Sequence, residues 1–470
     1  MNRRTCSFWK IFAAVFLSLL PPLMASHVHA QTVTFVHGFS GPDGELPRYG
    51  ALIQGRDGAL YGTTQSGGSA NEGVIYKLRA TGNGNLTFHD FNGTDGSTVD
   101  GGVTLGRDGS YYGVTALGGS ANKGTLFKID ASGTYTLLYS FTGGADGIYP
   151  VAAPTQAADG IFYGTTSGSS ESILPTVYKY SPTLGLSTIY TFTNFTQPEN
   201  PLLQATDGNL YISTPGGGTQ GCGSIVKLTT AGILKSSYSL NCTLPNPTGP
   251  IGALIQASDG FLYGTTQGGG PLNAGTIFKL DLKAKALTVL YNFGTVANDG
   301  AGAQAGLVQG TDGNFYGTTT IGGTRNLGTI YKITPTGTYT QLYSFSGTSG
   351  AQPAFPEASL IQHTNGAFYG TTENGGSLQL GNVFKLDMGL APFVTFVSSS
   401  GRVGQPAQIL GQGLTGATSV TFNGVAATSF SVVRDTYMTA VVPTGATTGS
   451  VVVATPTGVL TSNVAFHVLK

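Results

Sequence analysis

Residues 57–64 read Asp-Gly-Ala-Leu-Tyr-Gly-Thr-Thr, and versions of this phrase return six times, beginning at Asp108, Asp159, Asp207, Asp259, Asp312 and Asn365. Successive copies start between 48 and 53 residues apart. Repetition at a nearly fixed period of this length indicates one supersecondary unit repeated along the chain. The period therefore decides the fold class before any other feature.

Each unit divides into four short strands separated by tight turns. In the sixth unit, Leu307–Gln309 precedes the Asp312-Gly313 turn, and residues 314–319, 328–333 and 339–345 supply the other strands. An Asp-Gly pair suits a hairpin because glycine adopts positive φ without steric cost. Four antiparallel strands in ~50 residues is the pattern of a propeller blade, whereas a β-helix repeats at half this length or less.

The seven units contain only six fourth strands between them. They end at Phe91, Phe141, Phe192, Leu240, Phe293 and Phe345, and the seventh unit runs into Ala391-Pro392 without one. Residues 32–39 align with residues 338–345, phenylalanine on phenylalanine, so the N-terminal strand is expected to complete the last unit. The sequence therefore predicts an all-β protein whose residues 31–390 form a seven-bladed β-propeller closed by the N-terminal strand.

The recurring phrases resemble those of a known family. Asp-Gly-x-Leu/Phe-Tyr-Gly-Thr-Thr, together with Gly-Thr-Ile-Phe-Lys-Leu at residues 275–280, is similar to the GloVer tandem-repeat proteins of bacteria. The resemblance covers roughly residues 31 to 390. It implies an exported, modular protein and assigns no site residue.

The sequence pattern of residues 391–470 differs from that of the repeats. The stretches Gly404–Gly411, Val420–Gly424 and Gly449–Ala454 are alternating strands punctuated by glycine and proline. They resemble an IPT/TIG domain, which implies an immunoglobulin-like β-sandwich after the propeller.

The N-terminus has the features of a signal peptide. Arg3 and Arg4 precede the apolar run 11–20, which is too short to span a bilayer, and Val28-His29-Ala30 forms a small-residue cleavage site. We expect residues 1–30 to be removed and the product to be secreted or held at the cell surface, with no membrane span.

Composition narrows the function classes. Charged residues make up 9% of the chain and the formal net charge is 0, which lacks the basic footprint of a nucleic-acid binder. The two cysteines after the leader, Cys222 and Cys242, flank one hairpin almost symmetrically, so an exported chain is expected to join them in a disulfide.

Some polar residues recur in every unit. A lysine on the third strand could form an anion-binding ring, but a residue present in all units is more simply a building part, so we predict a structural role for Lys77, Lys128, Lys179, Lys227, Lys279, Lys332 and Lys385. Every unit except the second, which has Leu105 at this position, carries a glutamine on its innermost strand. This glutamine is expected to form hydrogen bonds with backbone groups rather than to line a sugar-binding site.

No catalytic constellation, cofactor motif or metal-ligand spacing is present, so we predict no catalytic residue, no cofactor and no metal. Variation concentrates in the loops that join successive units and in those between second and third strands, which share one face in propellers. The predicted ligand-binding residues on this face are Asp43, Glu45, Arg48, Asp146, Tyr149, Glu199, Asp299 and Glu357.

These observations favour a monomeric binding or interaction protein whose partner is an extracellular protein or polysaccharide. One alternative is an extracellular carbohydrate-active enzyme, a lyase or hydrolase with its site at the propeller mouth. Another is a structural envelope protein. An enzyme should bring polar residues of different units within ~6 Å of one another with shifted pKa values, and a binding module should show a broad face without that cluster.

Overall fold

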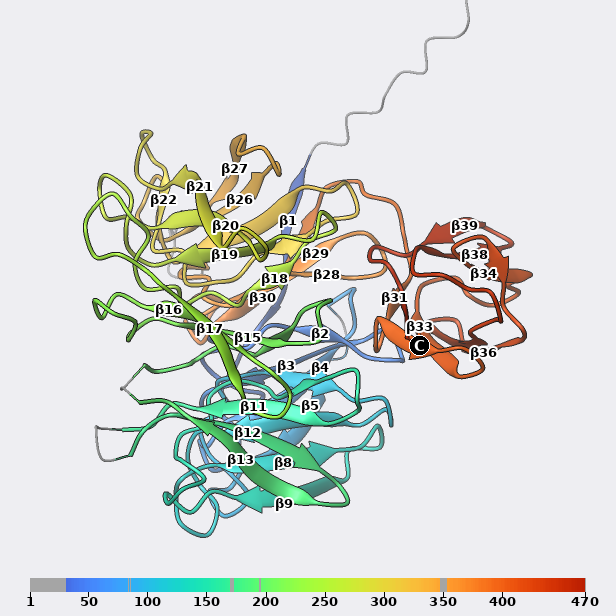
Figure 1. Ribbon diagram of the computed structural model, residues 1–470, viewed down its shortest axis with the longest axis horizontal. Helices are drawn as coiled ribbons and strands as arrows, with labels where there is room; N and C mark the ends of the chain where they lie inside the picture. The colour runs from blue at the N-terminus through green and yellow to red at the C-terminus, as the bar shows by residue number, and fades with distance from the viewer. Residues whose placement is uncertain are drawn as a thin grey trace, which may run out of the picture.

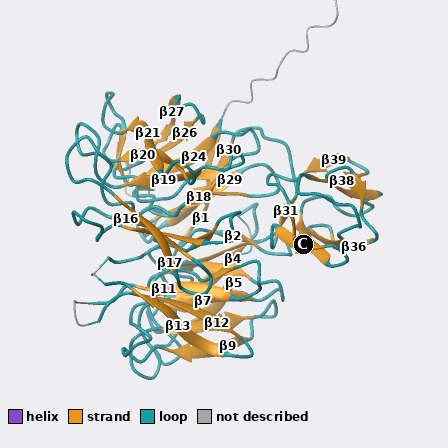
Figure 2. Ribbon diagram, viewed as in Figure 1, coloured by secondary structure: helices purple, strands orange, loops and turns teal. Residues whose placement is uncertain are grey.

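The computed structural model describes residues 31–82, 84, 86–169, 173–193, 196–346 and 353–469. These residues form strands and loops only (Figure 2). The expected signal peptide, residues 1–30, lies outside the described residues. Within the described ranges, no helix is long and apolar enough to cross a membrane.

The repeats form seven four-stranded antiparallel sheets that resemble propeller blades (Figure 1). The first four sheets are β2 (Ile53–Gln54), β3 (Leu60–Thr64), β4 (Val74–Leu78), β5 (Leu86–Asp90); β6 (Val103–Leu105), β7 (Tyr111–Thr115), β8 (Thr125–Ile129), β9 (Tyr135–Ser140); β10 (Thr155–Gln156), β11 (Phe162–Thr166), β12 (Thr176–Ser181), β13 (Gly185–Thr191); and β14 (Leu203–Gln204), β15 (Leu210–Thr214), β16 (Ser224–Leu228), β17 (Leu234–Ser239).

The remaining repeat sheets are β18 (Ile255–Gln256), β19 (Leu262–Thr266), β20 (Thr276–Asp281), β21 (Ala286–Asn292); β23 (Val308–Gln309), β24 (Phe315–Thr319), β26 (Thr329–Ile333), β27 (Tyr339–Ser344); and β28 (Ile361–Gln362), β29 (Phe368–Thr372), β30 (Asn382–Asp387), β1 (Thr32–Gly38). A two-stranded sheet joins β22 (Gly300–Ala301) to β25 (Ile321–Gly322).

The N-terminal strand completes the last of these sheets. β1 pairs with β30 in antiparallel register from Thr32 opposite Asp387 to Gly38 opposite Asn382. In Figure 1 the blue β1 accordingly lies beside the orange strands of the chain's last repeat. This pairing confirms the predicted position of the N-terminal strand.

The Asp-Gly turns join the first and second strands of each repeat. Their glycines, from Gly58 (φ 75°) to Gly366 (φ 94°), lie in the left-handed region in all seven repeats. Glycine occupies this region without the clash that a Cβ would cause, which explains why the phrase keeps it.

A second glycine accommodates a close approach between strands. Gly62 on β3 lies opposite Tyr76 on β4, and a Cβ at Gly62 would collide with that ring. Six repeats keep this pairing of glycine with an aromatic ring. The fourth repeat instead pairs Ile212 with Val226, which exchanges volume between the two strands and keeps the gap filled.

Inner-strand glutamines connect neighbouring repeats. Each side-chain carbonyl accepts a hydrogen bond of 2.7–3.0 Å from a backbone N–H of the repeat before it, and Gln54 accepts from Thr364 of the last repeat. The side-chain amides of five glutamines also donate to the carbonyl of their own turn glycine. The predicted backbone role of Gln54, Gln156, Gln204, Gln256, Gln309 and Gln362 is confirmed. We call these six the glutamine belt.

The belt is interrupted where the second repeat carries Leu105. There the Arg56 guanidinium donates to the Arg107 carbonyl and to Gln408 Oε1, both at 2.7 Å, and Thr436 Oγ1 donates to the Arg56 carbonyl at 2.7 Å. Gln408 and Thr436 belong to the C-terminal part of the chain. The C-terminal residues therefore dock at the repeat boundary that lacks a glutamine.

The C-terminal residues form a lobe beside the repeat sheets (Figure 1). Its strands are β31 (Thr395–Phe396), β33 (Pro406–Leu410), β37 (Tyr437–Val441), β36 (Phe430–Arg434); β35 (Val425–Ala426), β34 (Ser419–Phe422), β38 (Val451–Thr455), β39 (Gly458–Thr461); and the parallel pair β32 (Ser400–Arg402), β40 (His467–Leu469). Side chains of both four-stranded sheets share one core, including Ile409, Phe422, Met438 and Val453.

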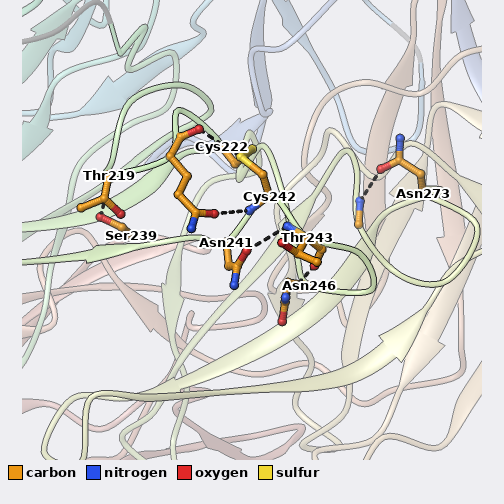
Figure 3. The surroundings of a disulfide bond; sticks show 10 residues. Thr219, Cys222, Ser239, Asn241, Cys242, Thr243, Asn246 and Asn273 are labelled. Carbon is orange, nitrogen blue, oxygen red and sulfur yellow. Dashed lines mark hydrogen bonds between the residues drawn. A yellow bond between two sulfur atoms is a disulfide. The ribbon is translucent and has the colours of Figure 1, made fainter.

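Cys222 and Cys242 form the predicted disulfide, which lies across the β16–β17 hairpin (Figure 3). Their Cα atoms are 5.4 Å apart. The Cys242 backbone N–H also donates to Gln220 Oε1 at 2.9 Å, so the outer end of this hairpin is held twice.

Replacing Gln54 with leucine should destabilise the fold. Gln54 is 5% exposed, and its loss leaves the buried Thr364 N–H without its acceptor. We expect the free energy of unfolding to fall by about 1–3 kcal/mol, measured by urea denaturation. Gln256→Leu is the matched control, because its partner Thr206 is exposed and water can replace the bond. Equal losses for both variants would contradict this account.

Removing the disulfide should also lower stability. The bond closes a loop of 20 residues, so the double substitution Cys222→Ala with Cys242→Ala should cost about 3 kcal/mol in thermal or urea unfolding. Two free thiols in the denatured, unreduced mature chain would show that the bond does not form in solution.

Candidate functional site

One cavity is lined by the same position of all seven repeats. Counting eight residues back from the turn residue of each phrase gives Tyr49, Asp100, Val151, Glu199, Ile251, Gln304 and Glu357, and all seven line it. Asn200, Ala305 and Ser359 complete the lining of a volume of about 190 Å³. We call these seven residues the ring position and the cavity the channel mouth.

The inner strands place this cavity away from the C-terminal lobe. In each repeat the ring position precedes the inner strand, and the Asp-Gly turn follows that strand. The lobe contacts the turn end, where Thr436 and Gln412 lie near Gly58. The channel mouth therefore lies at the opposite end of the inner strands, among the loops that join successive repeats.

Glu357 is a largely buried carboxylate of the channel mouth. Its side chain is 10% exposed, and its buried Oε2 has no hydrogen-bond partner among the described residues. Burial raises the pKa of Glu357 to about 7, with further upward contributions from Glu373 and Asp100 that exceed the opposing effect of Arg48.

Two other carboxylates share this environment. Burial raises the pKa of Asp100 to about 6 against the opposing effects of Gln65 and Arg48, and Asp100 Oδ1 also lacks a hydrogen-bond partner within the described ranges. Burial, assisted by the charge of Asp100, raises the pKa of Glu199. The three side chains come from three different repeats, and the charge of Asp100 contributes to the raised pKa of both Glu357 and Glu199.

Arg48 is the cation next to the channel mouth. Its guanidinium pairs with Glu373 and donates to Gln65 Oε1 at 3.4 Å, and its Nε lies 3.9 Å from Glu357 Oε2. The neighbouring Tyr49 is 47% exposed, and its pKa is raised to about 12 by burial and by the charge of Glu357. Negative groups thus outnumber positive ones here.

The structure brings three of the predicted ligand-binding residues together. Glu199 and Glu357 line the channel mouth, and Arg48 lies beside it. The other five, Asp43, Glu45, Asp146, Tyr149 and Asp299, do not line it.

Three of those five hold their own loops in place. Asp43 bonds the His37 ring at 2.9 Å, Asp146 accepts from the Tyr139 hydroxyl at 3.1 Å, and Asp299 accepts from the Tyr291 hydroxyl at 2.8 Å. Each of these aromatic partners lies at an equivalent place on the fourth strand of its sheet. An acidic residue in a variable loop can therefore serve the fold rather than a ligand.

Sequence reasoning missed Tyr49 and Asp100. The signal was available, because both stand at the same offset from the turn residue as Glu199 and Glu357.

The recurring lysines lie opposite the recurring tyrosines. Lys77 is the cross-strand neighbour of Tyr61, and the same register holds in every repeat sheet. The Tyr61 hydroxyl donates to Asp57 Oδ2 at 3.0 Å, and Lys77 Nζ lies 2.6 Å from the same oxygen. Such contacts are those expected of scaffold residues.

The pairing of lysine with the turn aspartate is not uniform. Lys128 and Lys227 also pair with their turn aspartates, whereas Lys279 lies over the Phe261 ring at 5.1 Å and no ion pair with Asp259 forms among the described residues. The described part of the chain also contains no group of three histidine, cysteine or acidic residues that could hold a metal ion.

A second cavity, of about 270 Å³, lies at the junction with the C-terminal lobe. Arg107 lines it, but its guanidinium already donates to the carbonyls of Ala157 and Ala158 and to Ser398 Oγ. With these donors of Arg107 occupied, the exposed Arg402 is the other cation of this lining.

Comparisons with known proteins bear on family and fold. The model of the Gloeobacter/Verrucomicrobia repeat matches residues 25–202 and 197–432. The second match runs beyond residue 390, and nothing in the comparisons supports a separate IPT/TIG domain at residues 391–470. No curated protein matches the chain.

Solved structures similar to this one are distant. An oligogalacturonate lyase solved with manganese is 12% identical with a TM-score of 0.50, and covers 77% of this chain and 93% of its own. A candidate 6-phosphogluconolactonase from Bacteroides fragilis is 18% identical with a TM-score of 0.46, and covers 66% of this chain and 86% of its own. At such identities the likeness concerns the fold, an all-β array of propeller-like sheets.

Glu357→Gln should stabilise the protein in a pH-dependent way. The pKa of Glu357 rises from 4.5 in the unfolded chain to about 7 in the folded one, so the folded state holds a proton that the unfolded state releases. The free energy of unfolding of the wild-type protein should therefore decrease as the pH rises from 4.5 to 7. The variant should be more stable by about 1–3 kcal/mol at pH 8 and equal to wild type near pH 4.5.

Urea denaturation across this pH range measures the difference. Glu45→Gln, in the same loop region but outside the channel mouth, is the control and should show no comparable gain. A Glu357→Gln variant less stable than wild type at pH 8 would show that the Arg48 contact outweighs burial.

Proposed function

The chain belongs to the Gloeobacter/Verrucomicrobia repeat family, and we propose that it is a binding protein whose channel mouth recognises a small polar ligand or one unit of a polysaccharide. One observation carries the proposal. The ring position lines a single cavity and differs between repeats, reading Tyr, Asp, Val, Glu, Ile, Gln and Glu.

The contrast with the scaffold positions supports this view. Glutamine recurs in six repeats because each must hold a neighbour, and tyrosine recurs in seven because each packs between sheets. A position that only built the ring would face the same requirement in every repeat. The ring position instead combines acidic, aromatic, aliphatic and amide side chains around one space, as ligand sites do.

The size of the channel mouth favours a small ligand. Its volume of about 190 Å³ lies below the ~300–1,000 Å³ typical of pockets for drug-sized molecules. A single sugar ring or a chain end fits this scale better than a protein surface does. Among the partners expected from the sequence, we therefore favour a polysaccharide or its fragments.

The wider architecture of this proposal has three parts. The seven sheets form a closed seven-bladed propeller, which the β1–β30 pairing supports. The C-terminal lobe is an immunoglobulin-like sandwich, which its two sheets with a common core support. The chain is exported, which the disulfide favours because such bonds persist in oxidising compartments.

A second candidate function is acid-catalysed cleavage of the bound ligand. The pKa values of Glu357 and Asp100, about 7 and about 6, favour it, because a carboxylic acid protonated near neutral pH can act as a general acid. Glu199 would then be the candidate base. Acidic residues of different repeats that line one cavity and have raised pKa values are a feature expected of an enzyme.

Screening the mature chain against mono- and oligosaccharides, with binding and products measured together, tests both functions. We expect a ligand whose affinity falls at least tenfold in Asp100→Ala and Glu199→Ala. The control Asp146→Asn lies in an equivalent loop outside the channel mouth and should bind like wild type. Ligand binding that these channel variants leave unchanged would refute the proposed site, and product formation lost in Glu357→Gln would establish the second candidate.

A further inference from the structure

We propose that the ligand of the channel mouth is an organic cation, a protonated amine held by the arc of Glu357, Tyr49 and Asp100. This inference rests on the proposed function, since it names the ligand class of the same site. Three observations support it: the negative charge balance around the cavity, the buried acceptor atoms that have no hydrogen-bond partner among the described residues, and a lining that combines acidic, aromatic and aliphatic side chains.

The charge balance around the cavity is negative. Asp100, Glu199 and Glu357 line the channel mouth, and the described lining contains no lysine or arginine. Arg48, just outside, is shared between Glu357 and Glu373. With a neutral ligand the buried carboxylates are neutralised only by taking up protons, whereas a cation compensates their ionised form.

Two carboxylate oxygens of the channel mouth are buried without a hydrogen bond within the described ranges. Glu357 Oε2 and Asp100 Oδ1 are buried, and neither has a hydrogen-bond partner in the described part of the chain. Arg48 Nε, a buried donor that also has no hydrogen-bond partner among the described residues, lies 3.9 Å from Glu357 Oε2, while the terminal nitrogens of the guanidinium contact Glu373 and Gln65. An ammonium group offers three donors and no acceptor, which suits these two buried carboxylate oxygens.

The rest of the lining favours an organic cation. Tyr49 stands between Glu357 and Asp100 in the order of the repeats, and its half-exposed ring can pack against an ammonium or the CH groups beside it. Val151 and Ile251 flank Glu199 with apolar surface. A carbon skeleton that carries an amine contacts both kinds of surface.

Binding should be linked to proton release. The titratable and charged groups facing the arc are Asp100, Glu199, Glu357, Glu373, Arg48 and Tyr49. An ammonium favours the ionised carboxylates, so binding pulls protons from Glu357 and Asp100, whose pKa values lie near 7 and 6. Affinity should therefore rise with pH from 5.5 to 7.5.

Isothermal titration calorimetry on the mature chain tests this with matched probes. Glucosamine is compared with N-acetylglucosamine, and 1,4-diaminobutane with its mono-N-acetyl derivative. In at least one pair the member with more free amine should bind tenfold or more tightly at pH 7.5. At pH 6.5 its apparent enthalpy should differ between two buffers of different ionisation enthalpy, which reports the released proton.

Isosteric variants assign the effect to the arc. Glu357→Gln and Asp100→Asn should each reduce the preference for the amine at least tenfold, and Glu45→Gln should leave it unchanged. Chemical denaturation of each variant separates lost binding from lost folding.

The outcomes distinguish the two proposals. Neutral probes that bind at the channel mouth as well as amines do would overturn the inference and leave the proposed function standing. Probes that all fail to bind, or that bind regardless of the ring position, would overturn both.

Discussion

The hydrogen bond from a backbone N–H of one repeat to the glutamine side chain of the next is the interaction on which the arrangement depends. It acts at the inner strands, which are only two or three residues long and make few ladder bonds of their own. The glutamine belt links neighbouring inner strands at six of the seven repeat boundaries, and the ring-position residues precede these same strands, so the belt helps to position them. The scaffold and the channel mouth thus share one set of restraints.

The exception at Leu105 shows how the belt and the C-terminal lobe relate. Where no glutamine bridges the first and second repeats, Arg56 and Gln408 supply hydrogen bonds around the Arg107 carbonyl. The lobe therefore makes contacts at the boundary that lacks a belt glutamine, and its Gln412 also donates to Thr364 Oγ1 at the boundary that Gln54 bridges. Because its contacts replace those that other boundaries make internally, the lobe forms part of the scaffold at this point and is more than a tethered appendage.

Much of the fold could be predicted from the sequence because the same structural unit is repeated seven times along the chain. The Asp-Gly turns, the four-strand unit, the place of β1 and the Cys222–Cys242 bond all follow from comparing one copy with another. The site was harder to predict. Asp43 and Asp299 bear charges in variable loops just as Glu199 does, and only the fold shows that their carboxylates turn back to fourth-strand rings while Glu199 faces the cavity.

The β1–β30 pairing has a consequence for the order in which the protein can assemble. β1 is the first strand of the array to leave the ribosome, yet its partner β30 ends at Asp387, so the last sheet stays incomplete until nearly the whole repeat array is available. Contacts of such large sequence separation form slowly, because the loop they close must be ordered first. Until then both β1 and β30 present unpaired edges. If the chain stays unfolded until it has crossed a membrane, β1 and β30 are both available when folding begins. The time during which either strand has an unpaired edge is then shortest.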